Sequence, residues 1–146
     1  MSLSNIFDVA GSAMSAQTVR LNTTSSNIAN AESVASSVDQ TYRARHPVFM
    51  AQYTSALGQN SVDPVTGQSS AGVSVAGIVE SQAPLQFRYE PDHPYANEEG
   101  YVAYPNVNVI EEMTNMISAS RSFQTNADVM NTAKQMMAQV LNLGQQ

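Results

Sequence analysis

The chain has 146 residues, a net charge of −6 and only 12% charged residues. This length predicts about one domain, and the absence of a basic stripe excludes a nucleic-acid binder. No apolar run of about 18 residues occurs, so we expect no transmembrane helix, and the lack of cysteine leaves the redox compartment open.

A first helix is predicted over residues 1–31 by a seven-residue repeat. Such a repeat is typical of a helix that buries one narrow face against another helix. Because helix nucleation is costly, we expect this helix to depend on packing for its stability. One row of the repeat is Phe7, Met14, Leu21 and Ile28, and its smaller, more polar partner row is Leu3, Ala10, Gln17, Thr24 and Ala31.

The helical period is lost over residues 32–71. The stretches 33–40 and 54–71 are rich in Ser, Asn, Asp, Gln and Gly, which predicts loops. Between them, residues 41–50 look extended, with Tyr42, Val48 and Phe49 as candidate anchors.

A period of two over residues 72–89 predicts two short strands joined around residues 81–84. Two strands alone are not stable, so we expect them to pack on the 41–50 stretch or on a helix. Residues 90–105 contain three prolines and several acids, and we predict a stiff, acidic connection that leads to the long C-terminal helix. The segment from Glu80 to Glu112 holds seven acidic residues and one base, Arg88, which gives it a charge of −6.

The longest predicted element is a helix from Asn108 to Leu143, about 50 Å long at about 1.5 Å per residue. Asn108 is a candidate cap, Glu111 and Glu112 suit the positive end of the helix dipole, and Gly144 suits the stop. The sequence again shows two rows with a seven-residue period. They are Val109, Met116, Phe123, Met130 and Met137, and Met113, Ser120, Ala127, Lys134 and Leu141.

Together these elements predict an α+β fold, in which long N- and C-terminal helices pair as an antiparallel coiled coil around a small β-rich central insert. The expected segments are 1–31, 32–71, 72–104 and 105–146. One register places Leu21 beside Phe123, and a slip by one heptad satisfies the pattern almost as well.

Little in the chain suggests chemistry. His46 and His93 each precede a proline and match no metal-ligand spacing, and Glu90, Asp92 and His93 form an acidic turn. No nucleophile elbow, phosphate loop or dinucleotide fingerprint occurs. We therefore predict no catalytic residues, no cofactor and no metal. An enzyme would need a pocket within 41–104 and a role for His46 or His93.

Thin apolar seams at both ends and few charges are typical of a subunit that completes its burial in a polymer. Head-to-tail contacts that do not close produce a filament or tube. The termini of such a subunit could stay largely disordered until assembly.

Two motifs carry a resemblance to a known family. The hexapeptide SNIANA at residues 26–31 resembles the N-terminal signature of the bacterial flagellar rod and hook family. RSFQTN at residues 121–126 resembles its C-terminal Arg-x-aromatic-x-x-Asn motif, with Phe123 where Tyr is usual. Further blocks resemble the proximal-rod members of that family: residues 5–13, 80–84, 89–94 and 100–109.

This resemblance implies a non-enzymatic structural subunit of the proximal rod, polymerised through its terminal helices into a tube that transmits motor torque and encloses the export channel. It implies contacts with other rod proteins, the adaptor at the rod base and the inner-membrane ring. It also implies passage through the flagellar type III export apparatus without a cleavable signal, and a location in the basal body.

The residues expected at the assembly interface come from the two helices. Asn27, Asn30 and Asn126 are also expected to satisfy backbone groups where a helix ends or chain segments cross. The alternatives are a soluble helical export chaperone or adaptor, and another rod-family subunit. The expected interface residues are Phe7, Met14, Leu21, Asn27, Ile28, Asn30, Met116, Arg121, Phe123, Asn126, Met130, Met137 and Leu141.

Overall fold

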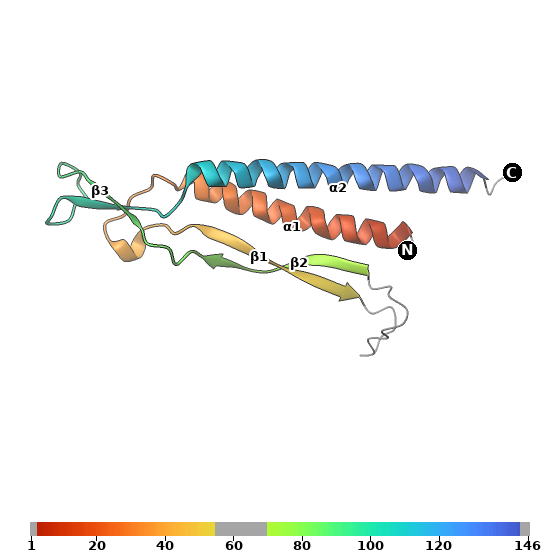
Figure 1. Ribbon diagram of the computed structural model, residues 1–146, viewed down its shortest axis with the longest axis horizontal. Helices are drawn as coiled ribbons and strands as arrows, with labels where there is room; N and C mark the ends of the chain where they lie inside the picture. The colour runs from red at the N-terminus through yellow and green to blue at the C-terminus, as the bar shows by residue number, and fades with distance from the viewer. Residues whose placement is uncertain (1–2, 55–69, 144–146) are drawn as a thin grey trace. The chain divides into compact units, whose positions relative to one another are not determined.

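A computed structural model describes residues 3–54 and 70–143 of the chain (Figure 1). A long helix lies at each end of the sequence, α1 (Leu3–Ala29) and α2 (Val109–Leu143). Between them come a short 3-10 helix, Val38–Gln40, and the strands β1 (Arg45–Thr54), β2 (Ser70–Glu80), β3 (Gln86–Tyr89) and β4 (Tyr101–Tyr104). The predicted α+β class, with two terminal helices and a small β-rich centre, is confirmed.

The helix ends follow the local signals in the sequence. At the start of α2, the Asn108 side-chain oxygen accepts hydrogen bonds from the backbone N–H of Ile110 at 3.1 Å and of Glu111 at 3.5 Å. Such a cap satisfies donors that have no partner within the helix. At the end of α1, the Asn30 side chain donates to the Ser26 carbonyl at 2.8 Å. The predicted Asn108 cap is therefore confirmed.

The strands form two separate two-stranded sheets, β1 with β2 and β3 with β4. The two strands expected within 72–89 are present as β2 and β3, with residues 81–84 between them. They do not pair with each other, because β2 pairs with β1 and β3 pairs with β4. Strand β4 lies within the stiff, acidic connection expected over residues 90–105, and it pairs antiparallel with β3, Tyr89 opposite Tyr101. Most of the loop expected at 54–71 lies outside the described residues.

Burial corrects the predicted seam of α2. Met116, Phe123, Met130 and Met137 are half-buried, as expected of an inner row. The predicted partner row is largely exposed, with Met113 54% and Leu141 64% exposed. The buried partner positions lie one residue earlier, at Glu112, Ala119 and Ala133. Spacings of three and four fit a helix seam equally well, so periodicity alone could not choose between the rows.

Small residues occupy the interior. The buried apolar side chains include Ala10, Ala16, Ala119 and Ala133, and among the largest fully buried ones is Val102. Alanine lets neighbouring backbones approach closely, but it buries little apolar area. Much of the large apolar surface of the described residues therefore stays outside this chain's own core.

By its internal contacts the chain divides into two compact units. One contains residues 1–19, 49–76 and 119–146, and the other contains residues 20–48 and 77–118. In the first, Ser12 of α1 accepts a hydrogen bond from the Val73 N–H of β2 at 3.1 Å. A side chain at Gly72 would place its Cβ 3.1 Å from the Ser12 hydroxyl, so the glycine permits this close approach.

Candidate assembly site

In the unit of residues 20–48 and 77–118, the central feature is the buried side chain of Asn27. Its amide nitrogen donates to the Arg45 carbonyl at 2.8 Å, and its oxygen accepts from the Arg45 N–H at 2.9 Å. The side-chain amide thus pairs with Arg45 as the peptide group of a neighbouring strand would. Asn27 is fully buried, and it fixes the last turns of α1 to the start of β1.

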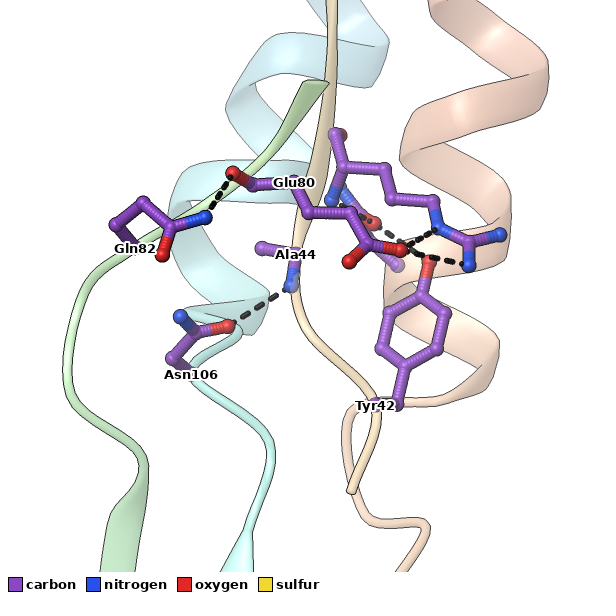
Figure 2. Close-up of polar contacts among 7 residues, drawn as sticks. Tyr42, Ala44, Glu80, Gln82 and Asn106 are labelled. Carbon is purple, nitrogen blue, oxygen red and sulfur yellow. Dashed lines mark hydrogen bonds and ion pairs between the residues drawn. The ribbon is translucent and has the colours of Figure 1, made fainter. Parts of the chain in front are cut away.

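A second asparagine holds the preceding residue. The Asn106 side-chain oxygen accepts from the Ala44 N–H at 2.8 Å, and its nitrogen donates to the Ala83 carbonyl at 2.9 Å. The Ala44 carbonyl in turn accepts from the Ser81 N–H at 2.7 Å. Figure 2 shows the bond between Asn106 and Ala44. We call Asn27 and Asn106 the asparagine clamp, because they bond successive residues at the start of β1.

Tyr42 and an ion pair surround the clamp. The Tyr42 hydroxyl donates to the Asn27 side-chain oxygen at 2.8 Å. The Arg45 guanidinium lies 5.5 Å from the centre of the Tyr42 ring and pairs with the Glu80 carboxylate at 2.9 Å (Figure 2). Burial raises the pKa of Tyr42; Arg45 opposes this rise, and Glu112 and Glu80 add to it. The hydroxyl therefore stays protonated and able to donate at neutral pH.

Glu112 lies in the first turn of α2, as the sequence predicted. Its side chain is also buried, which the sequence did not indicate, and one carboxylate oxygen lies 4.0 Å from Nδ1 of His46. Glu112 therefore combines a negative charge near the start of α2, where the helix dipole favours it, with burial on the inner face of the helix.

The described residues show no arrangement of side chains suited to catalysis. An open polar hollow of about 470 Å³ adjoins the clamp, and neither histidine nor cysteine lines it. Within residues 3–54 and 70–143, no group of three His, Cys, Asp or Glu side chains could hold a metal ion. His93 instead accepts the Tyr95 N–H through Nδ1 at 3.1 Å, a bond within the turn. None of the described helices is long and apolar enough to cross a membrane.

Large apolar side chains gather outside this interior. On the first turns of α2, Ile110, Met113 and Ile117 are 77%, 54% and 58% exposed. Their spacing of three and four residues places them on one face of the helix, away from the buried Glu112 and Ala119. We call these three residues the outer stripe. Contiguous exposed apolar surface of this kind marks an interaction site.

Comparison with known proteins fits this description. A family model described as flagella basal body rod protein matches residues 7–34, and one described as flagellar basal body rod FlgEFG protein C-terminal matches residues 98–143. The flagellar basal-body rod protein FlgC of Salmonella typhimurium strain LT2 is 50% identical over 99% of this chain and all of its own length. FlgC of Yersinia enterocolitica is 49% identical over the same shares. FlgC of Borreliella burgdorferi is 33% identical over 97% of each chain.

The chain belongs to the FlgC family of flagellar basal-body rod proteins. It is thus a structural subunit of the flagellar rod, as the resemblance implied. Both members of the asparagine clamp lie in segments matched by the rod models, Asn27 in the first and Asn106 in the second.

The structure assigns different roles to the polar residues predicted in this FlgC-family chain. Asn27 satisfies backbone groups where two segments cross, as predicted, and Asn30 satisfies a carbonyl at the end of α1. Asn126 donates to the Ser122 carbonyl of its own helix at 2.8 Å. Arg121 is exposed.

Sequence reasoning missed Asn106. It lies in the block 100–109 that carried the resemblance, but a single asparagine between a proline and a valine gives no periodic signal. The available indication was an asparagine between two apolar residues, Pro105 and Val107. If those neighbours are buried, as the structure shows, the amide between them must find hydrogen-bond partners.

Proposed function

We propose that this subunit polymerises through α1 and α2 into the tube of the proximal rod, transmits motor torque and encloses the export channel. The observation that carries the proposal is the outer stripe of α2. Three large apolar side chains stay exposed on one helix face, whereas alanines fill the interior. The subunit therefore presents an apolar surface that neighbouring subunits can bury.

Within the subunit, we place α1 and α2 as an antiparallel coiled coil. A hydrogen bond from Arg20 Nη2 to Asn115 Oδ1, 2.8 Å long, supports this pairing. It favours the register one heptad away from the first, with Leu21 beside Met116. Pairing Leu21 with Phe123 would separate Arg20 and Asn115 by about 13 Å along the helix, which exceeds the reach of their side chains.

The asparagine clamp suits torque transmission, because it joins α1 and the connection before α2 to one strand by several hydrogen bonds. A helix tied in this way resists sliding along its axis. The clamp holds the end of α1 and the residues just before α2. We therefore expect the parts of α1 and α2 that lie far from the clamp to gain most of their order on assembly.

The partners follow from this role. They are further rod subunits and other rod proteins, the adaptor at the rod base and the inner-membrane ring. The chain reaches them through the flagellar type III export apparatus. Its half-buried helix rows, including Phe7, Met14, Ile28, Met130 and Met137, would complete their burial in the assembled rod.

The test replaces the outer stripe with serine, as Ile110→Ser, Met113→Ser and Ile117→Ser together. Each side chain has about half to three quarters of its surface left to bury, worth about 1–2 kcal/mol apiece in the assembled rod. We expect the variant to keep the circular dichroism and thermal midpoint of the unaltered chain, but to be lost from isolated basal bodies and to leave cells non-motile.

The matched control is Thr114→Ala with Ser118→Ala, since both residues are exposed on the same turns of α2 beside the stripe. It should assemble and restore motility. If the serine variant also assembles and supports full motility, the outer stripe is not an assembly surface and the proposal loses its main support.

A further inference from the structure

The β3–β4 hairpin presents an exposed aromatic face. Tyr89 and Tyr101 are opposite each other in the register, and their rings meet edge to face with centroids 5.4 Å apart. Phe87 lies two residues before Tyr89, on the same face of the strand. Phe87, Tyr89 and Tyr101 are 56%, 65% and 42% exposed. We call these three residues the aromatic face.

The end of the hairpin is held in a defined conformation. Gly100 has φ +81°, and a side chain there would place its Cβ 2.9 Å from the Tyr89 ring. The Gly100 carbonyl accepts the Glu90 N–H at 2.9 Å, and the Asn97 side chain accepts the Tyr101 N–H at 2.8 Å. Because the rings are positioned before any partner arrives, binding costs little ordering entropy.

The opposite face of the hairpin is engaged within the chain. Arg88 lies over the Tyr104 ring, 4.3 Å from its centre, and the Tyr104 hydroxyl donates to the Glu90 carboxylate at 3.1 Å. Strand alternation places Arg88 and Tyr104 on the side away from Phe87. The hairpin therefore has one internally satisfied face and one face on which three large aromatic side chains stay exposed.

The charge around the aromatic face is one-sided. Residues 86–104 hold four acids and one base, Arg88, for a net charge of −3. Asp92, Glu98 and Glu99, in the loop joining the two strands, are exposed and form no ion pair with any residue in 3–54 or 70–143. An acidic rim around an apolar centre selects a partner with a basic rim.

We infer that the aromatic face docks on a different protein of the rod's surroundings, one that presents apolar side chains framed by lysine or arginine. This inference rests on the proposed function. A second copy of this chain fits poorly, because outside residues 80–112 its five bases are balanced by five acids. Two of those bases are already engaged, Arg45 with Glu80 and Arg20 with Asn115.

The experiment places the photo-crosslinking residue p-benzoylphenylalanine at position 87 in the full chain, in motile cells, with position 86 as control. Gln86 is also exposed, but it lies on the opposite face of β3. After irradiation, basal bodies are isolated and the linked peptides are identified by mass spectrometry. We expect position 87 to link to a lysine- or arginine-rich surface of another chain, and position 86 to give far less product.

A second variant tests the acidic rim. Glu98→Lys with Glu99→Lys should reduce crosslinking from position 87 by about fivefold or more, because it reverses charge at the rim. A link to a second copy of this chain, a link to an acidic surface, or no link from chains present in basal bodies would each overturn the inference. The amount of chain in basal bodies, measured before irradiation, separates these results from failure of the rod proposal, which would show as absence of the chain.

Discussion

Replacing Asn27 by alanine should release α1 from β1. The substitution removes three hydrogen bonds at once, those to the Arg45 N–H, the Arg45 carbonyl and the Tyr42 hydroxyl. The side chain is fully buried, so the freed backbone groups have no easy access to water.

The magnitude follows from these three bonds. Each contributes about 1 kcal/mol net, and a buried group left without a partner costs about 1–3 kcal/mol. Tyr42 is half-buried, so its hydroxyl can turn to solvent and recover part of its loss. We therefore expect a local destabilisation of about 2–3 kcal/mol, a factor of about 30 to 150 in the opening equilibrium.

Hydrogen exchange of single amides, followed by NMR on the full-length free chain, measures this directly. The Arg45 amide, which donates to Asn27, should exchange faster by that factor, whereas the Ala44 amide, which donates to Asn106, should change less. Asn30→Ala is the matched control, since the Asn30 side chain donates to the Ser26 carbonyl in the last turn of α1. Unchanged exchange at Arg45 in the Asn27→Ala chain would refute the clamp.

Three further predictions concern the same unit. Gly100→Ala should destabilise the hairpin by about 1–3 kcal/mol, through its positive φ and the 2.9 Å approach to Tyr89, seen as a lower thermal midpoint. The pKa of Tyr42 is raised in the folded chain, so the neutral hydroxyl contributes to the stability of the fold. This contribution is fully present below pH 10.0, the ordinary tyrosine value, and is lost as the pH rises through the raised pKa. Tyr42→Phe should therefore flatten the alkaline decline in urea-unfolding free energy. Glu80→Gln should cost less than about 1 kcal/mol, and nothing in 1 M salt, because its pair with Arg45 is half-exposed.

Local signals in the sequence were sufficient for the helices. The seven-residue rows and the Asn108 cap predict α1 and α2, because helix formation and capping depend on residues within a few positions of each other. The SNIANA motif likewise singled out Asn27. Its partner at Arg45 is 18 residues away, and no local pattern contains that pairing.

Tertiary contacts decided the rest. Strand pairing joined β3 to β4 rather than to β2, because register depends on which distant segment satisfies the edge, and β4 has too few residues to show a period of its own. Tertiary packing likewise determined which face of α2 is buried.

The sequence by itself thus determined the two helices, the Asn108 cap of α2 and the family signature, all of which depend on residues close together in the chain. Only the tertiary structure decided which row of α2 is buried, because Ala119 and Ala133 allow close approach while Ile110, Met113 and Ile117 do not. The same packing leaves the large apolar side chains on the outside, where another subunit can cover them.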